Sequence, residues 1–264
     1  MTAMTVDRAA RTFEPRTIPF ARVVAIELRK MFDTRAGFWL MSSIAAAAVV
    51  ASVAVIAFGS DQAQAYSSFG QAFGIPMTII LPMVAVLAVT SEWTQRSGLT
   101  TFTLVPHRGR VAWGKAAATA VVAVVSMALA FGVGALGTLL GSALHDTAVV
   151  WDVSMSQALY IVAGDAVAMA MGFMLGVLIR NSPGAIVAYF VYSFVVPTLS
   201  GLLAASQAWW RDLQPWLDFN FDHYRLYDGG LSAEQWLQTG TSALLWFVLP
   251  LTIGLVTLLR SEVK

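Results

Sequence analysis

The sequence has no cysteine, only three histidines and little charge, and each shortage removes a class of function. Without cysteine the chain can form no disulfide, no thiolate metal site and no cysteine nucleophile. The histidines, His107, His145 and His223, are scattered, and neither a zinc-protease motif nor a serine-hydrolase motif occurs. We therefore expect no catalytic residue, no metal and no cofactor in this chain.

Charged residues make up only 12% of the 264 residues, whereas a soluble domain carries about 25%. So few charges cannot cover a surface that faces water, and 58% of the residues are hydrophobic. Lipid must therefore be much of the solvent. The net charge of +1 gives no reason to expect a nucleic-acid partner.

Six apolar runs are each long enough to cross a bilayer, which takes roughly 20 apolar residues. They lie near 37–58, 71–90, 112–141, 158–180, 184–204 and 240–259. We predict an all-α integral membrane protein with an N-terminal segment (1–36), a six-helix transmembrane domain (37–259) and a short tail (260–264). The first run is too long for the apolar core of a signal peptide.

Small residues and prolines interrupt these runs. The G-xxx-G pairs at 137–141 and 172–176 either allow close helix packing or reflect how common glycine is in membrane helices. Prolines fall inside the runs at Pro76, Pro82, Pro197 and Pro250. Each predicts a kink, either static or hinged, because neighbouring groups in a bundle can satisfy the freed backbone.

The basic residues predict the orientation. All of the 16 Lys and Arg residues except Arg211 and Arg225 lie on the side of the N-terminus, the 91–111 loop and the C-terminal tail. Cytoplasmic loops carry such an excess of positive charge. We therefore expect both ends of the chain to lie in the cytoplasm.

Two polar segments flank the spans. Apolar residues recur at helical spacing over 19–36, with Glu27, Arg29 and Lys30 among them, which predicts an amphipathic helix at the membrane surface. The outer segment 205–239 is too polar to span and carries four tryptophans. Its Trp209, Trp210 and Trp216 predict short interfacial helices that form either an exit lid or a passive, anchored loop.

Asp165 is the only ionisable side chain predicted to lie well inside a span. A charge in lipid is costly, so this residue is a functional candidate, either in transport or as a structural group facing a wet cavity. Gly164-Asp165 and Tyr227-Asp228 loosely resemble intramembrane aspartyl protease motifs, but Val162 replaces the usual glycine.

The loop between the second and third spans is the most distinctive stretch. It contains, in order, Glu92, Arg96, Gly98, Thr100, Pro106 and Arg108, and Lys115 follows at the start of the third span. Positive charge at the cytoplasmic face explains the arginines but not the order of the other residues. Residues 109–115 also match G-x-x-x-x-G-K, but Ala116 replaces the magnesium-binding Ser or Thr, which indicates a chance match.

This order, together with Glu27-Leu28-Arg29-Lys30 before the first span, resembles the permease subunits of bacterial type-2 ABC exporters, which include drug-resistance and bacteriocin-immunity permeases. The resemblance covers most of the chain, although Leu99 separates Gly98 from the Thr that usually follows it directly.

The resemblance implies a role for each polar segment. The 19–32 helix would be the elbow helix, the 91–111 loop would hold the coupling helix that docks on a separate ATPase, and 205–239 would form outer re-entrant helices that gate the exit. Two permeases, identical or paralogous, and two ATPase subunits carrying ATP and Mg²⁺ would assemble in the bacterial cytoplasmic membrane and export an amphipathic, drug-like or lipid-like substrate.

Two alternatives stay open. The chain could be a carrier that works without an ATPase and uses Asp165 as its proton site, or a membrane interaction protein that transports nothing. Copurification of an ATPase would separate the first interpretation from both alternatives.

Overall fold

The structure, a computed structural model, describes residues 18–33, 35–94 and 108–260. Within these ranges every regular element is a helix. Six helical stretches are long and apolar enough to cross a membrane: Gly37–Phe58, Pro76–Trp93, Gly109–Leu144, Met155–Ile179, Ser182–Ser206 and Ala233–Arg260. The predicted all-α architecture with six spans is thus confirmed by the length and composition of the described helices.

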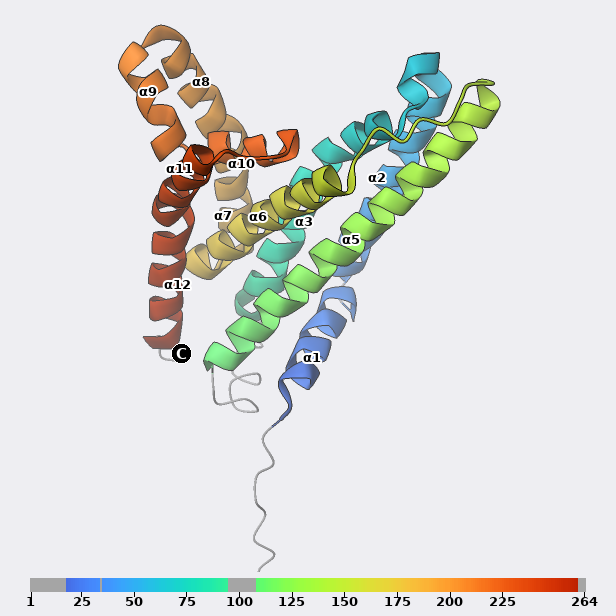
Figure 1. Cartoon of the computed structure of the whole chain (residues 1–264). Helices are drawn as coiled ribbons and strands as arrows, with labels where there is room; N and C mark the ends of the chain where they lie inside the picture. Colours follow the sequence, from blue (N-terminus) through green and yellow to red (C-terminus); the bar gives the residue numbers. More distant parts are fainter. Residues whose placement is uncertain (1–17, 34, 95–107, 261–264) are drawn as a thin grey trace, which may run out of the picture.

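In chain order the elements are α1 (Phe20–Asp33), α2 (Arg35–Phe58), η1 (Asp61–Gln64), α3 (Tyr66–Thr94), α5 (Arg108–Leu144), α6 (Met155–Ile179), α7 (Ser182–Phe190), η2 (Val191–Val195), α8 (Val196–Ser206), α9 (Ala208–Leu217), α10 (Phe219–Asp228), α11 (Ala233–Ala243), η3 (Leu244–Val248) and α12 (Leu249–Arg260). Two groups of helices diverge toward the top of Figure 1, with α2, α3 and α5 on one side and α8, α9, α11 and α12 on the other. We call the bottom of this view, where α1 lies beside the start of α5, the lower end, and the opposite side the upper end.

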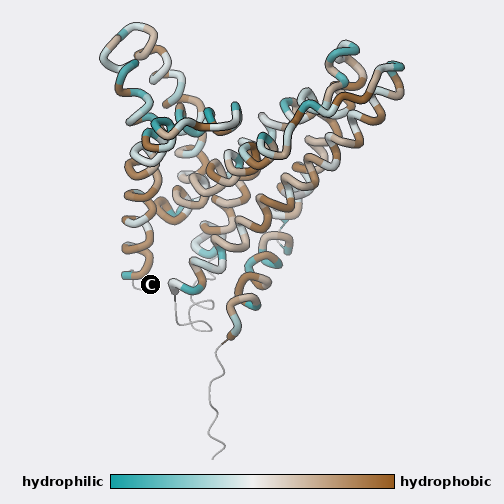
Figure 2. Tube along the Cα trace, in the orientation of Figure 1, coloured by the Kyte–Doolittle hydropathy of each residue, from teal (hydrophilic) through white to brown (hydrophobic). Residues whose placement is uncertain are grey.

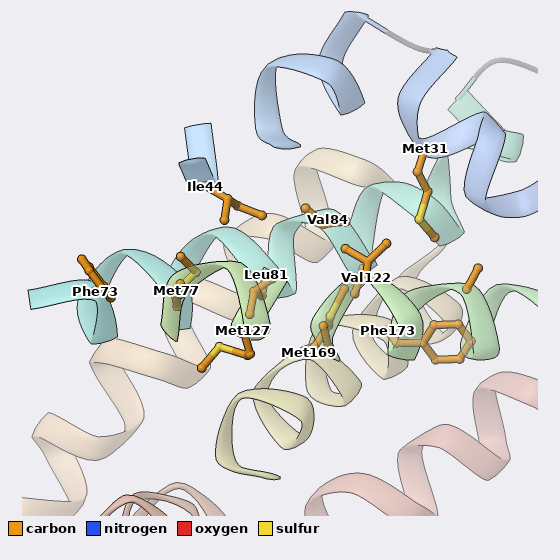
Figure 3. Close-up of a cluster of buried hydrophobic side chains, with 14 of the residues drawn as sticks. Met31, Ile44, Phe73, Met77, Leu81, Val84, Val122, Met127, Met169 and Phe173 are labelled. Atoms are coloured by element: carbon orange, nitrogen blue, oxygen red, sulfur yellow. The ribbon is translucent and has the colours of Figure 1, made fainter. Parts of the chain in front are cut away.

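Helix α3 is the centre of the bundle, since it packs against α2, α5, α6 and α7. Its buried side chains Phe73, Met77, Leu81 and Val84 form the middle of the main apolar core (Figure 3). Residues of α1, α2, α5 and α6 complete that core. Figure 2 shows the apolar residues along the middles of the long helices and the hydrophilic ones toward their ends, as expected for helices in a bilayer.

Both predicted glycine pairs lie at helix contacts. A Cβ atom at Gly172 would lie 2.5 Å from the carbonyl oxygen of Pro82, and one at Gly137 would lie 2.6 Å from the ring of Phe69. Glycine therefore lets α6 and α5 approach α3 more closely than any other residue would.

The prolines do not end their helices. Pro76 and Pro82 lie inside α3, whereas Pro197 and Pro250 each follow a π-helical stretch, η2 and η3. A proline ring clashes with the carbonyl four residues earlier, and the wider π turn gives that carbonyl another geometry. A π-helical turn thus precedes each of Pro197 and Pro250, and the ring centroids of Tyr192 and Trp246, one from each turn, lie 6.2 Å apart.

Several helices are longer than the apolar runs predicted. Helix α5 has 37 residues, or about 55 Å at about 1.5 Å per residue, which exceeds a hydrocarbon core of about 30 Å. The last helical stretch begins at Ala233 rather than near 240, because Ser232 and Gln235 form a capping box at its start. Helical hydrogen bonding therefore continues beyond the apolar residues that mark each span.

Candidate functional site

Four charged side chains meet at the lower end of the bundle, and we call Glu27, Lys30, Glu92 and Lys115 the charge cluster. Lys115 Nζ lies 2.5 Å from Glu27 Oε2 and 3.1 Å from Glu92 Oε1. Lys30 Nζ lies 2.7 Å from Glu27 Oε1 and 3.3 Å from Glu92 Oε1. Lys30 of α1 and Lys115 of α5 thus balance the carboxylates of Glu27 in α1 and Glu92 in α3.

The cluster is buried even though it lies near the helix ends. Glu27, Glu92 and Lys115 are each at most 5% exposed, and only Lys30 reaches the surface. Burial alone would lower the pKa of Lys30, but the carboxylates of Glu27 and Glu92 outweigh it and raise that pKa above its usual value. Each of the four charged groups is therefore paired with two groups of opposite charge.

Local sequence explains how the four residues meet. Glu27 and Lys30 are three positions apart, so they share one face of α1. A Cβ at Gly114 would lie 2.7 Å from Val23, so glycine lets α1 lie close against α5 and brings the neighbouring Lys115 within reach of Glu27.

The cluster also fixes the two helices that bound the distinctive loop. Glu92 lies in the last turn of α3, and Lys115 lies in the second turn of α5 and also donates to the carbonyl of Ala88 at 3.1 Å. Arg110 adds a second link between α5 and the N-terminal segment, since it donates to the carbonyl of Ile18. The ends of the loop are therefore held against α1.

The predicted coupling residues fall into two groups. Arg96, Gly98, Thr100 and Pro106 lie outside the described residues, and Arg108 begins α5. Glu92, another predicted coupling residue, lies in α3, and its side chain is buried and paired with two lysines. Glu92 therefore presents no charge to a partner.

In the predicted elbow helix, Glu27 and Lys30 belong to the charge cluster, whereas Arg29 is exposed and pairs with Asp33 at 3.2 Å. Lys115 belongs to the charge cluster but was not among the predicted site residues. The available signal was that a lysine at the start of an apolar helix needs a carboxylate partner.

Residues 109–115, which match the phosphate-loop motif G-x-x-x-x-G-K, lie within the helix α5. The ammonium group of Lys115 is paired with the carboxylates of Glu27 and Glu92. In a phosphate-binding site this motif forms a glycine-rich loop whose backbone N–H groups cradle the phosphates. This arrangement agrees with a chance match to the motif.

A cavity of about 820 Å³ lies farther toward the upper end, lined by residues of α3, α5, α6, α7, η2 and α10. Asp165 lines it and is 2% exposed. The hydroxyl of Tyr227 donates to Asp165 Oδ1 at 3.1 Å. Asp165 therefore lies in the wall of a cavity between helices, a position that fits both a transport role and a structural role.

Close packing of α10 on α6 builds this part of the wall. A Cβ at Gly164 would lie 2.8 Å from the ring of Tyr227, so glycine gives the tyrosine room beside Asp165. His223 Nε2 lies 2.7 Å from the carbonyl oxygen of Gly164, to which it can only donate. Burial lowers the pKa of His223, so the ring is neutral at pH 7.

Another part of the wall comes from α7 and η2. Tyr189 donates to the carbonyl of Thr78 at 2.9 Å, and Asn220 Nδ2 donates to the carbonyl of Tyr192 at 2.9 Å. Asn220 Oδ1 and the Tyr192 hydroxyl are buried without a hydrogen-bond partner among the described residues. Residues of the wall thus carry two polar atoms that make no hydrogen bond within the described part of the chain.

Asp228 also lines the cavity, so both aspartates of the weak protease resemblance border one space. The hydrogen bond found for Asp165 among the described residues nevertheless comes from a tyrosine and not from the second carboxylate. The carboxylate–carboxylate contact of an aspartyl protease dyad is not among the interactions of the described residues.

The exit-lid role predicted for the outer segment stays a prediction. Residues 205–239 do form short helices, α9 and α10, and the start of α11. Trp210 donates to the carbonyl of Ser200 at 3.1 Å and so joins α9 to α8, whereas Trp209 is exposed. The residues of this segment that line the cavity belong to α10, and Trp209, Trp210 and Trp216 are not among them.

Comparison with models of known protein families finds no match to this chain, and a search among curated proteins finds none either.

Proposed function

We propose that this chain is the permease subunit of an ATP-driven ABC exporter, with the lower end in the cytoplasm and the cavity on the path of the cargo. The charge cluster is the observation that carries the proposal. The resemblance rests on motif residues before the first span and on both sides of the loop, and four residues from those motifs form one buried unit.

This unit has the mechanical property that coupling requires. A membrane subunit without a nucleotide site can respond to ATP only through contact with a subunit that has one. Such contact would press on the 91–111 loop, whose flanking helices are joined to α1 by the charge cluster. A push on the loop would therefore move α1, α3 and α5 together.

Helix α3 would carry that movement to the cavity. It holds Glu92 at its lower end and contributes Phe73, Met77 and Thr78 to the cavity wall. Its contact with α6, which carries Asp165, is tight enough to require Gly172. In the working unit, two permeases would assemble with two ATPase subunits that bind ATP and Mg²⁺.

The test is affinity capture of the tagged full-length chain from its own host. An ATPase should copurify, and its ATP hydrolysis should rise with the chain present. Arg96→Glu, in the loop, should release the ATPase or abolish that stimulation, whereas Arg11→Glu, a matched reversal in the N-terminal tail, should do neither. Glu92→Lys is unsuitable here because it would break the charge cluster.

A proton-coupled carrier is the second candidate, because Asp165 is buried in the cavity wall. Transport that follows a proton gradient, needs no ATPase and stops in Asp165→Asn would replace the exporter proposal with this one. If no ATPase copurifies and nothing is transported, a membrane interaction protein becomes the better description.

A further inference from the structure

We infer that the cavity binds an amphipathic organic cation, with the Asp165 carboxylate facing the positive charge and the tyrosine rings facing the rest of the molecule. The inference rests on the proposed function only in taking the cavity as the cargo site. Binding itself can be measured without an ATPase.

The sign of the charge in the wall is the first argument. The lining residues include two carboxylates, Asp165 and Asp228, and neither Lys nor Arg is among them. His223 adds no positive charge at pH 7, because burial lowers its pKa. A buried carboxylate without a cation is costly, so a positively charged ligand supplies what the described wall lacks.

Aromatic rings give the second argument. Five tyrosines line the cavity: Tyr66, Tyr189, Tyr192, Tyr224 and Tyr227. They include two neighbouring pairs, with ring centroids 6.3 Å apart for Tyr189 and Tyr192 and 6.1 Å apart for Tyr224 and Tyr227. Ring faces attract cations and also pack against apolar groups, which an organic cation offers together.

Size and hydrogen bonding agree with this class of ligand. A volume of about 820 Å³ falls within the range of about 300–1,000 Å³ typical of sites for small organic molecules. Asn220 Oδ1 is a buried acceptor without a partner among the described residues, and Asn220 lines the cavity. The site can therefore also accept a hydrogen bond from an ammonium N–H.

The experiment compares two ions of similar size and apolar surface but opposite charge. Tetraphenylphosphonium and tetraphenylborate are titrated into the purified full-length chain in lipid nanodiscs, without any ATPase. We expect saturable binding of the phosphonium and much weaker binding of the borate. Equal binding of the two ions by the wild-type protein would overturn the inference, and this result requires no variant to fold.

Variants then locate the site. Asp165→Asn keeps the shape and removes the charge, so phosphonium binding should weaken by about tenfold or more. Asp165→Glu keeps the charge and should stay closer to wild type. Asp212→Asn removes an exposed carboxylate of α9 and should leave binding unchanged. Unaltered binding in Asp165→Asn would also overturn the inference.

The two proposals fail in different ways. Charge-selective binding that depends on Asp165, found in a chain that captures no ATPase, would overturn the exporter function and support the cation site. A chain that couples to an ATPase but binds both ions equally would support the exporter function and overturn the cation site.

Discussion

The charge cluster and the cavity both bury carboxylates, but they neutralise them in different ways. Glu27 and Glu92 each lie within 3.3 Å of two lysine ammonium groups. Asp165 accepts a hydrogen bond from a neutral hydroxyl, and neither Lys nor Arg is among the residues that line its cavity. Complete pairing holds three helices together, whereas incomplete pairing leaves a site ready for a ligand.

The position of each region agrees with this difference. The charge cluster joins α1, α3 and α5 where the chain enters and leaves the distinctive loop, and a loose joint there would absorb any movement. The cavity lies between α3, α5, α6, α7, η2 and α10, and no ion pair of the described residues joins two of its lining side chains.

Lys115→Met tests the paired region, and we expect the largest effect there. The variant leaves Glu27 and Glu92 buried with only the partly exposed Lys30 as a counter-ion. Breaking a buried ion pair costs about 3–5 kcal/mol. Thermal unfolding in detergent, followed by tryptophan fluorescence, should show a fall in Tm of about 10 °C.

The matched control is Arg29→Met, which breaks the exposed pair with Asp33 on the same α1 helix. Exposed pairs contribute only about 0–1 kcal/mol, so Tm should hardly move. Equal losses in the two variants would mean that the cluster contributes nothing beyond an ordinary surface charge.

Gly172→Ala tests the contact that joins the two regions through α3 and α6. The new methyl group would lie 2.5 Å from the carbonyl oxygen of Pro82, and backbone cannot move aside cheaply. Overpacking of this kind costs about 1–3 kcal/mol, so Tm should fall by about 5 °C and phosphonium binding should weaken.

Gly132→Ala in α5 is the control, because a Cβ there would meet no atom within 4 Å. Alanine also favours a helix over glycine, so this variant should be as stable as wild type or more so. Tolerance of alanine at Gly172 would show that α3 and α6 are not closely coupled.

Hydropathy was enough to predict the six helices, because each needs only a local run of apolar residues. The same rule missed their ends, as in α5, where Arg108 and Arg110 belong to the helix although they are charged. Asp165 could be singled out because one acid in a long apolar run conflicts with its surroundings.

What the sequence could not predict are the partners. Glu27 and Lys115 are 88 positions apart, and no periodicity links them. The cavity likewise collects side chains from six helical elements, and α10 contributes Tyr227 beside Asp165 from 62 positions away. Such contacts depend on how whole helices pack, which a pattern along one chain does not encode.

The smallest expected effect concerns pH, and it again separates the upper end from the charge cluster. Asp222 accepts hydrogen bonds from Ser242 at 2.7 Å and from Arg225 at 3.2 Å, and so joins α10 to α11. Burial raises the pKa of Asp222 from 3.8 to about 6, although both donors act against the increase. The folded protein therefore holds this proton more tightly than the unfolded chain does.

Stability from this proton is fully present below about pH 4 and is lost as the pH rises through about 6. The raised pKa of Lys30 keeps that member of the charge cluster protonated throughout this range. We therefore expect the Tm of the wild-type protein to fall slightly between about pH 5 and about pH 7 through this group. Asp222→Asn cannot titrate and should flatten that slope, whereas Asp212→Asn, at an exposed position of α9, should keep it. If the Tm of Asp222→Asn falls with pH as steeply as that of the wild type, the pH dependence arises outside the α10–α11 contact, and the upper end is no more sensitive to pH than the charge cluster.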